Sequence, residues 1–354
     1  GQDKAKYRFN WHAPIVIDPF DENVLYTAAE VVFRSKDEGM SWEVISPVLT
    51  KDDETKQQAG GSPSSLETSG QEAYNTIHRM VASTVEKGVL WTGSDDGLVY
   101  VTRDGGESWD NVTPPDMPED TDVYELEASP HDAGTVYVVA SRYRTANDFA
   151  PYLWKSADFG KTWVNLSDNF PQTEITRTIR EDTVRKGLLF AGTETGIFLS
   201  YDDGATWKRL NLNLPAVPVH DIKIKHEDLC IATFGRSFWI LDDITPLRQW
   251  DEEYREQTSH LFEPRTHVRL GINWWAVYGG GVGGGQKNYF VQTGRMGHTF
   301  YELGIVDGER KRQFIDAGDA RPYAAIIHYW LGEEAYDVSL SILDENDEVI
   351  KTYE

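Results

Sequence analysis

The chain has 354 residues, including 30 glycines, 12 tryptophans, 17 tyrosines and 14 phenylalanines, and its formal charge at pH 7 is −24. This length can bury a sizeable core, and the glycine and aromatic content favours short strands joined by tight turns over a helical fold. The acidity argues against a nucleic-acid-binding protein and against binding to an anionic membrane, and no apolar run is long enough for membrane insertion.

Alternating apolar residues bounded by turn residues predict strands along most of the first 245 residues. They fall at residues 7–17, 24–28, 31–34, 74–83, 88–93, 98–102, 124–128, 135–140, 152–156, 175–181, 187–192, 197–200, 219–224, 229–233 and 237–241. Residues 46–71 contain GGSPSS and few large apolar side chains, so they are predicted to form a long exposed loop. Residues 141–151 replace a tight turn with a longer connection.

One eight-residue pattern, Ser/Thr-x-Asp-x-Gly-x-Ser/Thr-Trp, occurs four times, and we call its copies the four tryptophan turns. They are SKDEGMSW with Asp37 and Trp42, TRDGGESW with Asp104 and Trp109, SADFGKTW with Asp158 and Trp163, and SYDDGATW with Asp202 and Trp207. The aspartate can accept backbone N–H bonds, glycine can adopt φ > 0, and tryptophan supplies a large apolar plug. We therefore assign these aspartates and tryptophans a structural role.

The tryptophan turns resemble the Asp-box, or bacterial neuraminidase repeat, of β-propellers. The interval between Trp163 and Trp207 matches the ~40 to 50 residues of a four-stranded blade. Five such units can be recognised, and the fifth, residues 219–241, keeps the strand rhythm but lacks the turn motif. The resemblance implies an all-β fold: a β-propeller with Asp-box blades, either whole or part of a larger or tandem propeller.

Other runs resemble one bacterial family more closely, among them YRFNWHAPIV, GSDDGLVYVTRDGGESW and GRSFWILDDITPLRQ. That family carries tandem propellers related to the sortilin N-terminal domain and is labelled glycosyl hydrolase-like. The resemblance implies a secreted, cell-surface or periplasmic protein. It also implies either a missing neighbouring segment or a different ring closure, since only five units are present. The label transfers a fold and not a reaction.

We expect three regions: propeller blades at residues 1–245, a helical linker at 246–261, and a β-rich, sandwich-like segment at 262–354 that either includes strands from residues 262–320 or is incomplete. Strands are predicted in the last region at 324–331, 336–343 and 349–353. The run GGGVGGG at 279–285 lacks the Lys-Ser/Thr of a phosphate-binding loop, so a flexible loop is predicted there. Because residue 1 is glycine, we expect a processed product or a piece of a longer chain.

In a propeller blade, the tryptophan turns and the starts of the innermost strands lie at opposite ends, so a ligand site is expected at the strand starts. Turns at that end contribute Glu30, Asp95, Asp96, Arg142, Arg144, Asp148, Glu194 and Arg236. Strand starts contribute Asn10, Trp11, His12, Tyr74, Tyr124, Arg177, His220 and Asp221. Carboxylates, arginines and aromatic rings together predict a polar site at the axial mouth of the ring.

Two functions fit these residues, and both stay open. In a binding module, the side chains recognise a glycan, peptide or protein without chemistry. In a glycoside hydrolase, sialidase-like or otherwise, two of Asp95, Glu194 and Asp221 would flank a sugar as acid and base or nucleophile. A third alternative is a scaffold within a larger extracellular assembly, with other segments of a longer chain as partners. The histidine spacing indicates no metal site and no cofactor is implied, although acidic turns could bind Ca²⁺.

Overall fold

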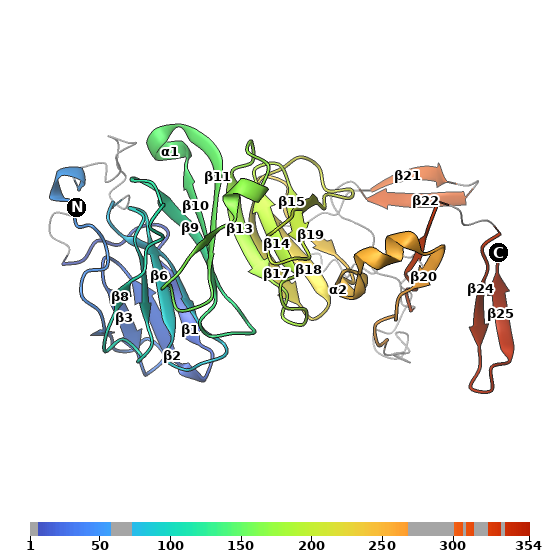
Figure 1. The fold of residues 1–354 in the computed structure, drawn as a ribbon, viewed down its shortest axis with the longest axis horizontal. Coiled ribbons are helices and arrows are strands. Elements are labelled where there is room, and N and C mark those ends of the chain that lie inside the picture. Colours follow the sequence, from blue (N-terminus) through green and yellow to red (C-terminus); the bar gives the residue numbers. More distant parts are fainter. Residues whose placement is uncertain (1–5, 58–72, 268–300, 307–308, 315–324, 334–336) are drawn as a thin grey trace. The chain divides into compact units, whose positions relative to one another are not determined.

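The computed structural model describes residues 6–57, 73–267, 301–306, 309–314, 325–333 and 337–354. The chain divides into two compact units, Gly1–Leu241 and Asp242–Glu354. The described residues are almost entirely strands and turns (Figure 1), which confirms the all-β prediction. The glycine-rich run at residues 279–285 lies outside the described residues.

In its described parts, residues 6–57 and 73–241, the first unit contains five antiparallel sheets, the blades, each made of strands consecutive in the chain. Blades 1 to 4 have four strands and blade 5 has three. In chain order the strands are β1 (Ile15–Asp18), β2 (Asp21–Ala28), β3 (Val32–Ser35) and β4 (Glu43–Val44); β5 (Ile77–Ala82), β6 (Leu90–Ser94), β7 (Val99–Thr102) and β8 (Asp110–Asn111); β9 (Asp122–Ala128), β10 (Val136–Arg142), β11 (Asp148–Ser156) and β12 (Val164–Asn165); β13 (Thr176–Glu181), β14 (Leu189–Thr193), β15 (Ile197–Ser200) and β16 (Lys208–Arg209); β17 (Val219–Lys225), β18 (Asp228–Thr233) and β19 (Phe238–Leu241).

The first strands of successive blades lie next to one another: β1 contacts β5, β5 contacts β9, β9 contacts β13 and β13 contacts β17. The blades therefore follow one another around a common axis with their first strands innermost, which is the propeller arrangement predicted. In Figure 1 this succession runs from the blue β1–β3 to the yellow β17–β19.

Apolar side chains fill the space between neighbouring blades. Val99 and Val101 of blade 2 cluster with Val123 and Leu126 of blade 3, and all four are at most 1% exposed. The second strands read as apolar runs, such as VYVVASR in β10 and LFAGT in β14, because both of their faces are covered. Burial against the next blade, rather than local propensity, thus holds each short sheet in place.

The same pattern of hydrogen bonds occurs in each of the four tryptophan turns. In the turn of blade 2, Gly106 N–H donates to Thr102 Oγ1 at 2.9 Å, and Ser108 N–H donates to Asp104 Oδ1 at 2.9 Å. The hydrogen bonds from Ser108 hold the pKa of Asp104 well below its ordinary value. The aspartate is therefore a charged acceptor that closes the turn between the third and fourth strands.

The tryptophan turns of blades 2 and 3 also contact the preceding blade. Trp109 Nε1 donates to Ile45 O at 2.9 Å, and Trp163 Nε1 donates to Val112 O at 2.8 Å. Trp42 belongs to blade 1, which has no preceding blade among the described residues, and it is 43% exposed. The turn thus joins neighbouring blades as well as neighbouring strands.

Replacing Gly106 with alanine should destabilise the first unit much more than the same change at Gly39. Both glycines adopt φ > 0, 99° and 89°. A Cβ at Gly106 would lie 2.9 Å from Ile45 Cδ1 and Ile45 O, whereas at Gly39 the nearest atom, Leu25 Cδ1, is 3.6 Å away. Overpacking of this kind costs about 1–3 kcal/mol. Equal losses in urea unfolding of Gly106→Ala and Gly39→Ala would show that the turn does not press on the preceding blade.

The longer connection in blade 3 forms a short helix, α1 (Tyr143–Ala146), that ends at Asn147 in a left-handed conformation. Strand β11 begins at Asp148, so the strand reaches further into the connection than the sequence predicted. The described part of the first long loop contains the 3₁₀ turn η2 (Glu54–Lys56), and η3 (Ser167–Asn169) follows β12.

The second unit begins with helix α2 (Thr245–Gln249) and the 3₁₀ turn η4 (Glu252–Glu256). Strands among its described residues form three two-stranded sheets: β20 (Ser259–Leu261) with β23 (Tyr329–Leu331), β21 (Tyr301–Val306) with β22 (Glu309–Phe314), and β24 (Leu340–Leu343) with β25 (Val349–Tyr353). In the part of the chain that is described, no helix is long and apolar enough to cross a membrane.

Candidate functional site

The strand register separates the two ends of the first unit. Ile77 at the start of β5 pairs with Ser94 at the end of β6, whereas Leu90 at the other end of β6 pairs with Thr102, where the tryptophan turn begins. Blade 4 repeats this order. The starts of the first strands and the turns after the second strands therefore share one end, which we call the mouth.

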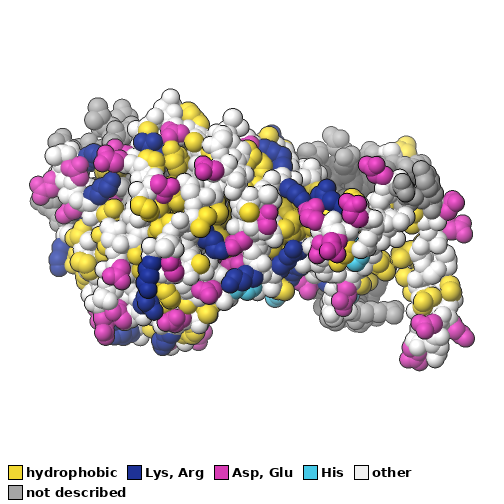
Figure 2. All heavy atoms as spheres, viewed as in Figure 1, with side chains coloured by type: hydrophobic (Ala, Val, Ile, Leu, Met, Phe, Trp, Pro, Cys, Tyr) yellow, Lys and Arg dark blue, Asp and Glu magenta, His cyan; other side chains and the backbone are white. Residues whose placement is uncertain are grey.

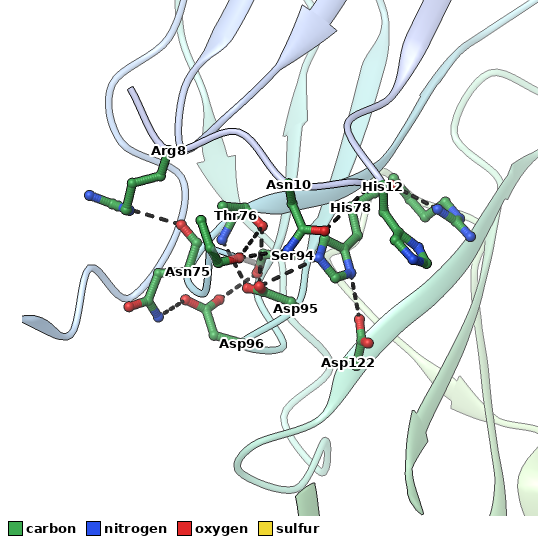
Figure 3. Close-up of polar contacts among 12 residues, drawn as sticks. Arg8, Asn10, His12, Asn75, Thr76, His78, Ser94, Asp95, Asp96 and Asp122 are labelled. Carbon is green, nitrogen blue, oxygen red and sulfur yellow. Dashed lines mark hydrogen bonds and ion pairs between the residues drawn. The ribbon is translucent and has the colours of Figure 1, made fainter. Parts of the chain in front are cut away.

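Blade 2 carries a buried polar cluster at the mouth (Figure 3). Asp95 Oδ1 accepts the N–H of Thr76 at 2.9 Å, and Asp95 Oδ2 lies 3.5 Å from His78 Nε2. On its other side, His78 Nδ1 is 3.1 Å from Asp122 Oδ1 in blade 3. The imidazole of His78 thus lies between two carboxyl groups from neighbouring blades.

Burial and neighbouring charges together set the protonation of this cluster. It raises the pKa of Asp95 to about 8, and the nearby His78 opposes that shift only in part. Burial lowers the pKa of His78, but Asp122 and Asp95 outweigh it, so the net pKa is raised. At neutral pH the Asp95 carboxyl group therefore keeps its proton.

The segment before β1 crosses this cluster. Asn10 Nδ2 donates to Ala73 O at 2.6 Å, and the ring of His12 stacks on His78 with centroids 5.2 Å apart. Burial, then His78 and Arg79, lower the pKa of His12 to about 4. His12 is therefore a neutral imidazole at physiological pH.

A second cluster joins blades 3 and 4 and consists of Tyr124, Tyr143, Arg144, Arg177 and Glu194. The guanidinium of Arg177 lies 4.7 Å from the ring centroid of Tyr124 and 4.8 Å from that of Tyr143. Arg177 Nε donates to Glu194 Oε1 at 2.5 Å, and Arg144 Nε donates to Tyr143 Oη at 2.6 Å. We call these five residues the arginine–tyrosine cluster.

The phenol of Tyr143 is unusual within this cluster. Burial raises its pKa, but hydrogen bonds from Tyr124, Arg144 and Arg177 outweigh burial, so the net pKa is lowered. The side chain of Arg177 is only 7% exposed, and its Nη1 has no hydrogen-bond partner among the described residues. The cluster therefore combines aromatic faces with an incompletely bonded cation.

His220 of blade 5 shows that cations from several blades converge. Its ring stacks on Phe234 with centroids 5.2 Å apart. Burial lowers its pKa, and so do the charges of Arg177, Arg79 and Arg144, although Glu194 opposes them. The charges of Arg79 and Arg144 also lower the pKa of His12. The carboxylates of this chain of net charge −24 are spread over the visible face (Figure 2), and at the mouth arginines lie beside carboxylates, as Arg177 does beside Glu194.

The three carboxylates predicted as catalytic all bond within the protein. Asp95 is 5% exposed, Glu194 pairs with Arg177, and Asp221 Oδ1 accepts from Arg180 Nη2 at 2.7 Å. These contacts satisfy carboxylate oxygens that a sugar or a catalytic water would otherwise use.

The residues predicted to bind a ligand lie in different environments. His12, Arg144 and His220 lie with the converging cations, whereas Arg142 and Asp148 pair with each other at 3.1 Å inside the insertion. Tyr74 is 4% exposed, Trp11 is 64% exposed, and Arg236 is also exposed.

Sequence reasoning missed His78, Arg79, Asp122 and Tyr143. His78 and Arg79 follow the predicted Tyr74 by four and five residues, and Asp122 precedes the predicted Tyr124 by two, so alignment of the five first strands could have found them. Across the described ranges, no group of three or more His, Cys, Asp or Glu side chains is arranged to hold a metal ion.

Replacing Asp95 with asparagine should flatten the pH dependence of stability. The folded pKa is about 8 and the ordinary value is 3.8, so the folded state keeps a proton that the unfolded state releases. Stability is therefore lost as pH rises from about 4 to about 8, on the order of 1.4 kcal/mol per pKa unit at most. Asp95→Asn should be more stable than the parent at pH 8 and lose less stability across this range, measured by urea unfolding.

Asp104→Asn is the control, because the contribution of Asp104 to stability depends on pH in the opposite direction. The pKa of Asp104 is lowered by hydrogen bonds from Ser108, so its contribution is present above its ordinary pKa and is lost as pH falls. An Asp95→Asn variant with the parent's pH profile would contradict the protonation state assigned to Asp95.

Neither protein-family models nor curated proteins gave a match to this chain. Solved structures gave matches. The GH74 xyloglucanase from Xanthomonas campestris is 16% identical with a TM-score of 0.50, over 65% of this chain and 36% of the xyloglucanase. YCF48 bound to D1 peptide is 18% identical with a TM-score of 0.46, over 68% of this chain and 65% of that one. The extracellular domain of a hybrid two component system from B. thetaiotaomicron is 19% identical with a TM-score of 0.44, over 65% of this chain and 27% of that one. This chain thus spans about a third of the xyloglucanase, and at this identity the likeness shows the β-propeller fold alone.

Proposed function

We propose that this propeller recognises a ligand at the mouth, a glycan or peptide that carries an anionic group, and holds it without chemical conversion. The observation that carries the proposal is the buried guanidinium of Arg177, whose Nη1 has no hydrogen-bond partner among the described residues and which lies against the rings of Tyr124 and Tyr143. Arginine is suited to carboxylate and sulfate groups because its planar fork donates two parallel hydrogen bonds. Tyr124 and Tyr143 add aromatic faces on which a sugar ring or side chain can stack.

The state of the carboxylates favours binding over hydrolysis. A retaining or inverting glycosidase needs two carboxyl groups that face the scissile bond. Glu194 and Asp221 each have one carboxylate oxygen paired with an arginine, so only their other oxygens are left to face a sugar. One feature supports hydrolysis as a second candidate: burial raises the pKa of Asp95 to about 8, the direction that a general acid requires.

An array of acidic and neutral oligosaccharides together with acidic and neutral peptides tests the proposal. We expect retention of acidic probes and weak retention of neutral ones. Binding should weaken as salt rises from 0.05 to 0.5 M, because the Debye length falls from roughly 14 Å to roughly 4 Å and exposed charges are screened. Retention of neutral probes alone, or no salt dependence, would contradict the anionic ligand.

Hydrolysis is tested with the same acidic and neutral oligosaccharides and a chromogenic glycoside panel. The binding proposal predicts unchanged substrates after long incubation. Release of sugar that Asp95→Asn abolishes would instead support the hydrolase. A secreted or surface location is part of the proposal, because a glycan-binding mouth would meet its ligands there, and fractionation of expressing cells checks it.

A further inference from the structure

The two end blades expose apolar positions that the inner blades bury. The third strand of every blade contains an aromatic residue, and we compare the residue directly before it. That residue is Val32, Val99, Leu153, Ile197 and Phe238 in blades 1 to 5. The first four are 0% exposed, whereas Phe238 in blade 5 is 80% exposed. Ile240, two residues further along β19, is 59% exposed. We call Phe238 and Ile240 the trailing face.

The opposite side of blade 1 shows the same contrast. In each blade, the aromatic residue of the third strand pairs with a residue of the second strand, and that residue pairs in turn with one of the first strand. These first-strand residues are Ile15, Met80, Leu126, Ile179 and Ile222. Met80 is 4% exposed and the next three are 0% exposed, whereas Ile15 is 78% exposed. Ile17, two residues further along β1, is 60% exposed. We call Ile15 and Ile17 the leading face.

Inside the unit, these two kinds of position form one junction. Val32 of blade 1 clusters with Met80 of blade 2. Val99 of blade 2 clusters with Leu126 of blade 3, and Leu153 of blade 3 clusters with Ile179 of blade 4. The trailing face and the leading face are therefore the two halves of a junction that the chain already forms repeatedly.

We propose that copies of this chain associate head to tail, with the trailing face of one copy packed on the leading face of the next. The occupant is a second copy because each copy presents both halves in the same strand positions, so the contact continues the blade-to-blade interface around the propeller. The leading face would also give Trp42, now 43% exposed, a neighbouring blade like those that Trp109 and Trp163 contact. Such a heterologous contact forms a closed ring if the rotation closes and a longer assembly if it does not.

The charge of the chain sets a condition on this association. Each copy carries −24, so copies repel one another at low ionic strength. Salt screens this repulsion, while the apolar contact itself is not weakened by salt. Self-association should therefore strengthen with salt, which is the opposite of the salt dependence expected for an anionic ligand at the mouth.

Sedimentation velocity of the whole chain over a range of concentrations and salt tests the proposal. The parent should form dimers or larger species that increase with both. Phe238→Lys and Ile15→Lys should each shift the distribution toward the monomer. Val184→Lys is the control, since Val184 is 67% exposed and belongs to neither face. Circular dichroism of each variant confirms that it is folded.

Mixing the two variants tests the head-to-tail geometry. Phe238→Lys keeps a leading face and Ile15→Lys keeps a trailing face, so an equimolar mixture should recover one intact junction and form a heterodimer. A parent that stays monomeric at every concentration and salt would overturn the proposal. Association that neither substitution weakens, or a mixture that stays monomeric while the parent associates, would overturn it as well.

Discussion

Arg180→Met should destabilise the first unit by about 3–5 kcal/mol at pH 8, because removing one partner leaves buried charges without compensation. The side chain of Arg180 is 13% exposed. Its Nη2 lies 3.2 Å from Glu125 Oε2 and 2.7 Å from Asp221 Oδ1, and its Nη1 lies 3.5 Å from Glu127 Oε2. Arg180 therefore links the first strands of blades 3, 4 and 5.

The loss should be smaller at pH 5 than at pH 8. Burial raises the pKa of Glu127 to about 7 even though Arg180 opposes the shift, and without the arginine it should rise further. The folded variant then holds protons that the unfolded chain, with an ordinary glutamate pKa of 4.5, releases as pH rises. Stability of Arg180→Met relative to the parent therefore recovers as pH falls through 7 toward 5.

Urea unfolding of the parent and Arg180→Met at both pH values measures this effect. Lys36→Met is the control, because Lys36 is 63% exposed and its ion pair with Glu43 is a surface pair worth under about 1 kcal/mol. Equal losses for the two variants, or a loss for Arg180→Met that does not depend on pH, would contradict the buried network.

Leu126→Ala should cost about 2–5 kcal/mol, the range for truncating a buried leucine. Leu126 is 0% exposed and lies in the core shared by blades 2 and 3, where it clusters with Trp91 and Val99. Its removal leaves a cavity at a junction between blades rather than inside one sheet. The whole first unit should therefore unfold at lower denaturant concentration.

Leu212→Ala is the matched control for this experiment. Leu212 is 72% exposed, so the same substitution there should change stability by less than about 0.5 kcal/mol. If Leu126→Ala also falls below about 1 kcal/mol, the cores between blades do not carry the stability assigned to them.

The blade succession could be predicted from sequence because its signals are local. Each tryptophan turn fixes a glycine, an aspartate and a tryptophan within eight residues, and the strand pattern between turns repeats. Strand order then follows from short connections, which join neighbours in space. The extension of β11 into the insertion was missed because Asp148 accepts hydrogen bonds from Tyr152 and Arg142, a pairing that no local pattern marks.

The site could be predicted only as an end of the propeller. Its contacts join residues far apart in the chain, such as Arg177 with Tyr124 and Tyr143, and His78 with Asp122. Sequence position could indicate that Asp95 lies in a turn at the mouth, since Asp-Asp-Gly is a turn signature. It could not indicate that the carboxyl group is buried and protonated, because its burial depends on how neighbouring blades pack.

The affinity of Arg144→Ala for the acidic probe that binds tightest on the array tests the central claim most directly. Arg144 is exposed and belongs to the arginine–tyrosine cluster, and a hydrogen bond to a charged group is worth about 1.5–3 kcal/mol, so affinity should fall about ten- to a hundredfold. Lys161→Ala removes an exposed cation from a tryptophan turn at the opposite end and should leave affinity within about twofold of the parent. Unchanged affinity in Arg144→Ala, or an equal loss in Lys161→Ala, would contradict a ligand site at the mouth.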